Sequence, residues 1–285
     1  MADIAVMSDT NASLDFLEGG QSIGIVRSII YLGETAYTDT LELSATQFYD
    51  ALANDPSIMP KTAQPPMHVM IEAYKKLRDQ GAKDIIFVTI SSQMSGIYNT
   101  AKIAAKEVQG VRVHVFDSKS VAYPQARMAI RADALARDGQ TLESIMETLE
   151  AMRERNHIYF AVDTLKYLVK NGRLSGAQGF MGSMLRIKPL LEITPEGSVE
   201  SIEKIRTFKR ALQGVIDRYI QRTEHLDNVK PFICHANNPE AVETITAALK
   251  AHDETLGDIP TLPLTPAVGA HAGPGAIGLG YLLEP

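Results

Sequence analysis

The sequence predicts an α/β protein made of two α/β domains, with parallel and mixed sheets flanked by helices. Short apolar runs alternate with longer segments in which apolar residues recur with helical period, and this pattern is typical of the fold class. The chain has 285 residues, enough for one or two domains with a substantial core. Its 45% hydrophobic and 22% charged residues are typical of a globular protein. From the order of the elements we expect one domain over residues 1–155 and a second over 156–285.

The first half is expected to alternate strands with helices. Ser44 and Gln47 form a capping-box pattern at the start of a helix that reaches Ala53. Proline and glycine at positions 66 and 81 are placed to start and stop a second helix over 66–80. Three further helices are expected over 96–108, 121–137 and 141–155. The predicted strands are Ile4–Met7, Gly24–Leu32, Asp84–Ile90 and Val111–Phe116.

The second half is expected to restart with a strand at Ile158–Val162. After turns and short helices, Pro189–Thr194 and Val199–Lys204 are predicted to form a strand pair joined by a tight turn. A helix over 209–222, a strand over 231–235 and a helix over 239–251 follow, and the segment after them is rich in glycine.

Composition excludes several classes of function. A formal net charge of −6 gives no electrostatic footprint for nucleic acid, so we expect no nucleic-acid partner. Cys234 is the only cysteine, which excludes an intramolecular disulfide and a cysteine-rich metal cluster. Ala272–Leu283 is too short and too rich in glycine to span a bilayer, and no signal-peptide pattern precedes Ala5. We therefore expect a cytoplasmic protein without stable membrane insertion.

One candidate site lies where the strand ending near Ile90 meets the next helix. Ser91, Ser92, Ser95 and Gly96 surround this junction, where backbone N–H groups and the helix dipole favour an anion. Strand-to-helix junctions are also where open α/β sheets bind ligands. The alternative is that one serine only caps the helix.

Three other polar segments are candidates for the same site. Thr62 and Gln64 precede a helix, Arg173 follows the turn glycine Gly172, and His271 lies in a glycine-rich segment at 269–278. Taken singly, each has an ordinary structural explanation: a helix cap, a solvated surface charge and a structural histidine.

Common catalytic motifs are absent from the sequence. There is no Gly-Lys-Ser/Thr phosphate loop, no dinucleotide fingerprint around residue 273 and no Gly-x-Ser-x-Gly elbow. We therefore assign no catalytic residue, no metal and no cofactor.

Taken together and in order, these segments resemble the DegV family over essentially the whole chain. The similar motifs are 62–65, 91–96, Asp117-Ser118-Lys119, 171–175 with 187–189, Arg206 and 271–278. Ala63 and Asn171 depart from the serine and glycine of the family motifs, and 8–12 matches its N-terminal pattern only in part.

The resemblance implies a protein that encloses one long-chain fatty acid of the palmitate or oleate class. It implies that Thr62 and Ser95 hold the carboxylate, and Gln64, Ser92, Gly96 and His271 complete the ligand-binding set. Arg173 and Arg206, with His271, would lie near the head group or near the phosphate delivered to it. Family members serve as the non-catalytic binding subunit of a fatty acid kinase, whose ATP-binding partner makes the acyl phosphate.

The acyl chain would need a dry slot. Sixteen methylenes at roughly 0.8 kcal/mol each supply on the order of 12 kcal/mol before ordering costs. Candidate lining residues lie in Ile158–Leu168 and Phe180–Leu191, with Met94, Met181 and Met184 flexible enough to fit different chains.

Two other functions stay open at this point. One is a stand-alone phosphotransfer enzyme that uses His271 to carry phosphate. The other is a regulatory protein that responds to lipid.

Overall fold

Four parallel strands form the larger of the two sheets in the first half of the chain. The computed structural model describes residues 3–180 and 187–283. Strands β1 (Ile4–Asp9), β2 (Gly24–Val26), β6 (Asp84–Thr89) and β7 (Arg112–Asp117) pair in the order β2-β1-β6-β7. All six residues of β6 are buried, as a parallel strand covered on both faces requires.

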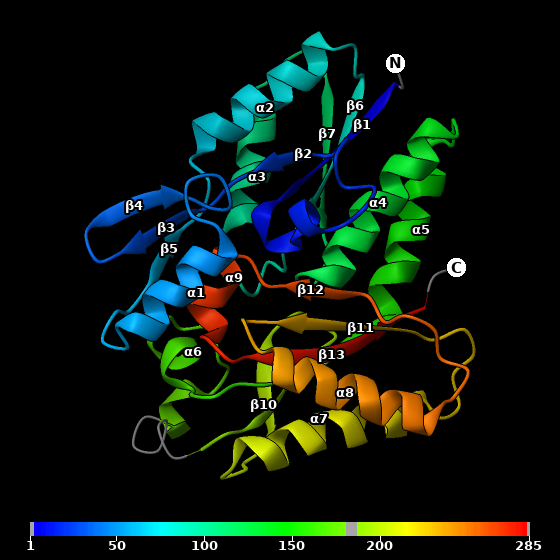
Figure 1. The fold of residues 1–285 in the computed structure, drawn as a ribbon. Helices are drawn as coiled ribbons and strands as arrows, with labels where there is room; N and C mark the ends of the chain where they lie inside the picture. Colours follow the sequence, from blue (N-terminus) through cyan, green and yellow to red (C-terminus); the bar gives the residue numbers. More distant parts are fainter. Residues whose placement is uncertain (1–2, 181–186, 284–285) are drawn as a thin grey trace.

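Helices cover both faces of this sheet (Figure 1). On one face lie α2 (Met67–Asp79) and α3 (Ile97–Lys106), and on the other lie α4 (Tyr123–Arg137) and α5 (Leu142–Glu154). Alternate residues of β6 serve the two faces: Ile85 and Phe87 belong to the core cluster that includes α2 and α3, and Ile86 and Val88 to the one that includes α4 and α5. The predicted helices of this half are confirmed to within a few residues at each end.

Helix α1 (Ala45–Asn54) begins with the predicted capping box. The Ser44 hydroxyl accepts from Gln47 N at 3.2 Å, and the Gln47 side chain accepts from Ser44 N at 3.0 Å. Two short 3-10 helices, η1 (Thr10–Ala12) and η2 (Leu14–Phe16), connect β1 to β2.

The prediction of one strand over Gly24–Leu32 is wrong. The chain leaves the parallel sheet after β2 and enters a separate antiparallel sheet of β3 (Ile29–Leu32), β4 (Thr35–Thr38) and β5 (Lys61–Ala63), in the order β4-β3-β5. At the break, Arg27 makes an ion pair with Asp15 at 2.8 Å. Continuous apolar character cannot reveal such a change of sheet. The segment around Thr62 is therefore a strand and not only a helix-start turn.

The second half contains a mixed six-stranded sheet. Its strands are β8 (Asn156–Ala161), β9 (Leu190–Ile193), β10 (Val199–Glu203), β11 (Lys230–His235), β12 (Thr261–Pro263) and β13 (Ile277–Leu282), in the order β10-β9-β8-β13-β11-β12. Its β11–β12 pair is parallel, and its other neighbouring strands are antiparallel. The predicted strand pair is thus confirmed as β9 and β10.

One face of this sheet is covered by α7 (Phe208–Thr223) and α8 (Pro239–His252), and the other face is turned toward the first half (Figure 1). Helix α9 (Pro266–Ala272) contacts α1, β3, β5 and the short helix α6 (Lys166–Lys170), so it lies where the two halves meet. The 3-10 helix η3 (Ala177–Phe180) follows α6.

The glycine-rich segment after residue 264 is mostly regular structure. It forms helix α9 and then β13, which lies in the interior of the six-stranded sheet between β8 and β11. Glycine is required within β13, because a Cβ at Gly280 would lie 2.4 Å from both the His157 carbonyl oxygen and Phe232 Cζ. Glycines that normally argue against a strand are here imposed by close packing.

The predicted division at residue 155 stays a prediction. All strands of the six-stranded sheet follow that residue, but the largest core cluster includes side chains from both halves, such as Phe48, Ile90, Val162 and Cys234. Within residues 3–180 and 187–283, no helix has the length and apolar character needed to cross a membrane.

Candidate functional site

A cavity of about 320 Å³ lies between the carboxyl edge of the parallel sheet and one face of the six-stranded sheet. Its first wall comes from residues that follow parallel strands: Asn11 after β1, Ser28 after β2, Ile90 after β6, and Val121 and Ala122 after β7. Because β1 has β2 on one side and β6 on the other, this edge is a topological switch point, where open α/β sheets bind ligands.

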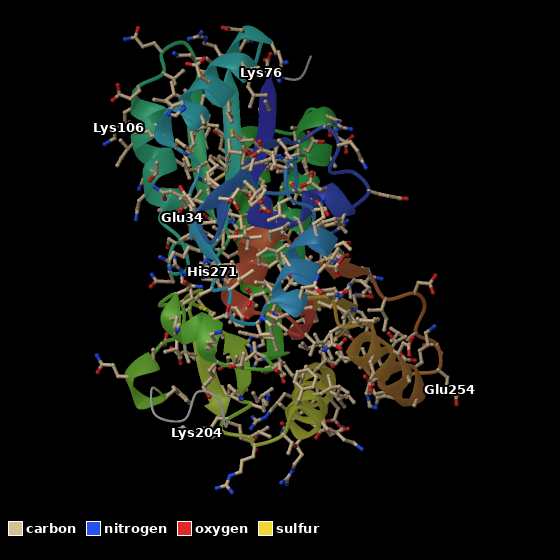
Figure 2. The ribbon with its side chains drawn as sticks, turned by 60° about the vertical axis from the view of Figure 1, so that its left-hand side comes forward. Glu34, Lys76, Lys106, Lys204, Glu254 and His271 are labelled. Atoms are coloured by element: carbon tan, nitrogen blue, oxygen red, sulfur yellow. The ribbon has the colours of Figure 1, made fainter. Side chains whose placement is uncertain are left out.

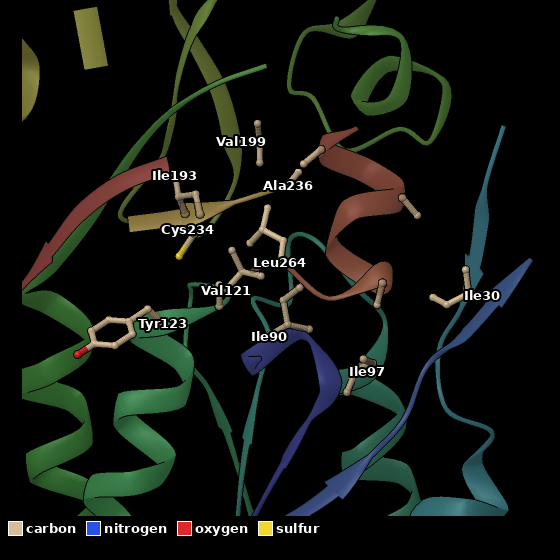
Figure 3. Packing of buried hydrophobic residues seen from close by; sticks show 14 of the residues in the cluster. Ile30, Ile90, Ile97, Val121, Tyr123, Ile193, Val199, Cys234, Ala236 and Leu264 are labelled. Carbon is tan, nitrogen blue, oxygen red and sulfur yellow. The ribbon is translucent and has the colours of Figure 1, made fainter. Parts of the chain in front are cut away.

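The second wall is apolar. It is formed by side chains of the six-stranded sheet and of the segments around it, and includes Ile158, Phe160, Leu168, Ile193, Val199, Cys234, Leu264 and Ala276. Figure 3 shows Cys234, Val121, Ile90 and Leu264 gathered in the same region of the interior. Such a wall suits a hydrocarbon chain and offers little to a polar ligand.

Six of the predicted site residues meet at the polar end of this cavity. They come from β5, the start of α3, the turn after α6 and the last turn of α9, and are Thr62, Gln64, Ser95, Gly96, Arg173 and His271. Gln64 and Gly96 are exposed, so this is the end of the cavity that faces solvent. Figure 2 shows His271 at mid-height of the molecule, between the two halves.

Thr62 and His271 are in direct contact. Thr62 Oγ1 lies 2.8 Å from His271 Nε2, and the direction of this hydrogen bond depends on which ring nitrogen carries the proton. His271 Nδ1 is buried and has no hydrogen-bond partner among residues 3–180 and 187–283. Burial, aided by the positive charge of Arg173, lowers the pKa of His271 to about 3. The imidazole is therefore neutral at physiological pH.

Ser95 lies just before α3, and its hydroxyl makes at most a weak capping hydrogen bond to the helix. The Ile97 N–H donates to Ser95 Oγ over 3.4 Å, which is long for a hydrogen bond, so this hydroxyl can serve a ligand. Ser91 is engaged instead: its Oγ donates to the Gly197 carbonyl at 2.7 Å and accepts from Gln93 N at 3.2 Å. It ties the helix start to the β9–β10 turn.

Gln64 and Gly96 form the rim of the polar end. Gln64 Nε2 donates to Thr100 Oγ1 at 2.8 Å, which links the β5 segment to helix α3. A Cβ at position 96 would come within 2.7 Å of Gln64 Oε1, so glycine there lets the two segments approach.

Arg173 is held beside this rim. Its Nε donates to the Met94 carbonyl at 3.1 Å, and its guanidinium also donates to the Asn171 carbonyl. Asn171 Nδ2 in turn donates to the Ala270 carbonyl at 2.9 Å, one residue before His271. Burial lowers the pKa of the Arg173 guanidinium, which nevertheless stays protonated.

Two predicted site residues do not line the cavity. Ser92 lies outside the cavity lining, and its backbone N–H donates a hydrogen bond to Asp117 Oδ1 at 3.1 Å. Arg206 lies in the segment between β10 and α7, and its side chain is exposed. The structure therefore brings Arg173 and His271 together at the polar end, but not Arg206.

The predicted lining segments are met only in part. Met94 and, from Ile158–Leu168, Ile158, Phe160 and Leu168 line the cavity. In the predicted segment 180–191, residue 180 and residues 187–191 do not line the cavity. Met181 and Met184 lie outside the residues that the structure describes.

Sequence reasoning missed several lining residues, among them Asn11, Ser28, Ile193, Val199 and Cys234. Ile193 and Val199 are cross-strand partners within the predicted strand pair. The sequence predicts that both residues lie in strands, but the alternation of residues along a strand does not determine which face of the sheet lines the cavity.

Comparison with known proteins agrees with the predicted resemblance. The family model of the DegV family, described as uncharacterised protein, matches residues 3–284. The chain belongs to the DegV family. The DegV domain-containing protein BH3627 of Halalkalibacterium halodurans is 31% identical and is covered, like this chain, over 100% of its length.

Two solved structures of DegV family proteins are similar over the whole fold. The crystal structure of DegV of Bacillus subtilis, a fatty acid binding protein, has a TM-score of 0.86, 28% identity and 100% coverage of both chains. The fatty-acid-binding DegV family protein of Thermus thermophilus has a TM-score of 0.86, 26% identity and 99% coverage of both chains. The predicted α/β fold is thus confirmed as the DegV fold.

Proposed function

We propose that this DegV family protein binds one long-chain fatty acid in the cavity and presents its carboxylate to an ATP-dependent kinase. The observation that carries the proposal is the layout of the cavity, whose apolar wall ends at the Thr62–His271 pair and Ser95. The fatty acid binding of the related proteins of B. subtilis and T. thermophilus supports it.

The acyl chain supplies most of the affinity in this proposal. Burial of each methylene contributes about 0.8 kcal/mol, whereas a hydrogen bond to a charged group contributes about 1.5–3 kcal/mol. The polar end therefore orients the ligand, and the apolar wall holds it. An acid of the palmitate or oleate class has the required division into one anionic end and one long apolar end.

The hydrogen-bond chemistry of the polar end suits a carboxylate. A carboxylate only accepts hydrogen bonds, so Thr62 must direct its hydroxyl proton to the ligand. Thr62 then accepts from His271 Nε2–H, so the neutral imidazole that burial favours is the tautomer with its proton on Nε2. Ser95, at the start of α3, supplies a second hydroxyl near the positive end of the helix dipole.

The partner reaction in this proposal is phosphoryl transfer to the bound acid. A carboxylate oxygen attacks the γ-phosphorus of ATP held by the kinase, ADP leaves, and an acyl phosphate forms. The exposed rim at Gln64 and Gly96 gives access from solvent, and Arg173 beside it offers a planar fork for phosphate oxygens. In this proposal Arg206 is a second arginine, besides Arg173, that supports phosphoryl transfer.

A stand-alone phosphotransfer role for His271 fits the geometry less well. Nε2 is engaged with Thr62, and Nδ1 is buried, so neither ring nitrogen is presented to a phosphate donor. In the described parts of the chain, no three His, Cys, Asp or Glu side chains gather to hold a metal ion. We therefore favour lipid binding over this alternative and over a purely regulatory role.

Native mass spectrometry of freshly purified protein tests the proposal. We expect a mass increment that matches one fatty acid, and recovery of that acid by organic extraction. Repeated absence of stoichiometric lipid, with no rise in melting temperature on addition of palmitate or oleate, would refute lipid binding. Acyl phosphate formed only when an ATP-binding kinase subunit is added would support the division of roles.

A further inference from the structure

One side of the cavity lies over the middle strands of the six-stranded sheet, β8, β13 and β11. Gly278 in β13 has Cys234 and Phe160 as its cross-strand partners, and all three line the cavity. Two residues further along β13, Gly280 lies opposite Phe232 on one side and Ile158 on the other. Residues two apart in a strand share a face, so Gly280 and Phe232 continue the wall that Gly278 and Cys234 begin.

Phe232 fills the space over Gly280. A Cβ at Gly280 would lie 2.4 Å from Phe232 Cζ, and Phe232 is fully buried. Its ring stacks on Tyr123 with the ring centroids 4.8 Å apart. In Figure 3, Cys234 and Val121 lie between Tyr123 and helix α9, which carries His271. Neither ring is itself part of the cavity lining, so the Phe232–Tyr123 pair lies behind the lining residues Cys234 and Gly278, on the side away from helix α9.

There is space for a Cβ atom at Gly278, but not at Gly280. A Cβ at Gly278 would lie 3.6 Å from Ile158 Cγ2 and 3.6 Å from Phe160 Cβ, which is ordinary van der Waals contact. Gly278 is not among the residues with positive φ, so alanine is compatible with its backbone. A methyl group at this position would thus be accommodated without strain, and it would occupy volume at the cavity wall.

We propose that the Phe232–Tyr123 pair is the stop for the terminal methyl group of the ligand, and that Gly278 beside it sets the longest acyl chain accepted. This inference rests on the proposed function and adds a length-selected class of straight-chain acids to it. A methylene that can no longer be buried should reduce affinity about fourfold, the equivalent of its transfer free energy of about 0.8 kcal/mol.

Two substitutions should move the length preference in opposite directions. The protein is offered an equimolar mixture of saturated acids from laurate to arachidate, and bound species are counted by native mass spectrometry. Gly278→Ala should shift the preferred acid toward shorter chains, and Phe232→Leu toward longer ones, by about fourfold per methylene in the ratio of neighbouring lengths. Retention of the wild-type length profile by both variants, or a shift of both in one direction, would overturn the proposal.

Matched controls separate this effect from general changes in packing. Gly214→Ala makes the same change on the outer helix α7, with the nearest neighbour of the new Cβ at 3.4 Å and away from the cavity. Phe87→Leu makes the same change at a fully buried residue of β6 whose ring packs on Tyr74 of α2 and whose cross-strand partners, Met7 and Val115, do not line the cavity. Both controls should keep the wild-type length profile.

A measurement on the unaltered chain covers the case in which Phe232→Leu does not fold. A palmitate analogue with a diazirine at its terminal carbon is bound and irradiated, and the modified residues are mapped by peptide mass spectrometry. Insertion should occur in the segments around Tyr123 and 232–234. Insertion confined to the head-group loops or to surface residues would overturn the proposal. Failure of the wild type to bind any acid would instead refute the proposed function itself.

Discussion

Thr62 and His271 lie 209 residues apart in the chain, and their side chains meet at 2.8 Å at the polar end of the cavity. Thr62 belongs to the small antiparallel sheet, and His271 to the last turn of α9. The contact thus joins the two halves of the molecule at the point where a ligand carboxylate would be held. A change at either residue should affect both binding and stability.

We expect Thr62→Val and Ser95→Ala to differ in one respect. Both should weaken fatty acid binding by about 1–3 kcal/mol, because each removes a donor to a charged group. Only Thr62→Val should also lower the melting temperature of the ligand-free protein, because it leaves His271 Nε2 without its partner. Titration with a fluorescent fatty acid and thermal unfolding would measure the two effects.

Ser92→Ala, whose hydroxyl lies outside the cavity, is the matched control and should behave as the wild type. Equal affinities for all three variants would contradict the assignment.

Arg173→Lys should separate binding from phosphoryl transfer. Lysine keeps the positive charge but loses the planar fork that takes two phosphate oxygens. We expect fatty acid affinity to stay nearly unchanged, while acyl phosphate formation with an ATP-binding kinase falls by an order of magnitude or more. Equal losses in both assays would mean that Arg173 simply holds the lipid.

Arg206→Ala should also reduce acyl phosphate formation and leave binding unchanged. Arg206 is exposed and outside the cavity, so its loss removes no contact with the bound acid. The control is Arg210→Ala, which removes an exposed arginine from the first turn of α7. The role of Arg206 would be excluded by full kinase-dependent activity in its variant.

Asp39 should make stability depend on pH. It is fully buried, and burial raises its pKa to about 7 against the opposing effect of the nearby Thr10 hydroxyl and Ala267 N–H. The folded state therefore holds a proton that the unfolded state releases above pH 3.8. The contribution to stability is fully present below that pH and is lost as the pH rises through about 7, at about 1.4 kcal/mol per pH unit.

Asp39→Asn removes this titration. Its melting temperature relative to the wild type should rise between pH 4 and pH 7 and stay level above it. Asp50→Asn, which makes the same change at an exposed residue, serves as the control. A constant difference between Asp39→Asn and the wild type across this range would show that Asp39 does not titrate there.

Cys234 should report on occupancy of the cavity. It is the only cysteine, it lines the cavity, and burial raises its pKa to about 12, so little reactive thiolate forms near neutral pH. Reaction with a soluble disulfide reagent should be slow in lipid-free protein and slower still after palmitate is added. Cys234→Ser provides the blank. If Cys234 reacts rapidly and at the same rate with and without palmitate, the bound acid does not cover its sulfur.

The sequence grouped the residues at the polar end of the cavity better than those of its walls. Thr62, Ser95, Arg173 and His271 belong to short motifs, so their order along the chain was enough to group them. The walls depend on which face of each strand is turned inward. Val199 and Ile193 read as ordinary strand residues until their pairing and the position of the opposite sheet are known.

The fold was predictable wherever local signals agree with the tertiary structure. The capping box of α1 and the start of α8 at Pro239 are local, and both are found. The change of sheet within Gly24–Leu32 and the strand β13 are not local. Gly278 and Gly280 lower the strand propensity of β13, and their positions are explained only by Phe232 and its neighbours across the sheet.

The place of β13 has a consequence for synthesis of the protein. This strand inserts between β8 and β11, both of which leave the ribosome much earlier, and its pairing partners have no neighbour on that side until residues 277–282 emerge. A nascent chain up to that point carries two unpaired strand edges, which are prone to pair with other chains. A premature stop before Ile277 would leave an aggregation-prone product whose cavity lacks the lining residues Ile277 and Gly278.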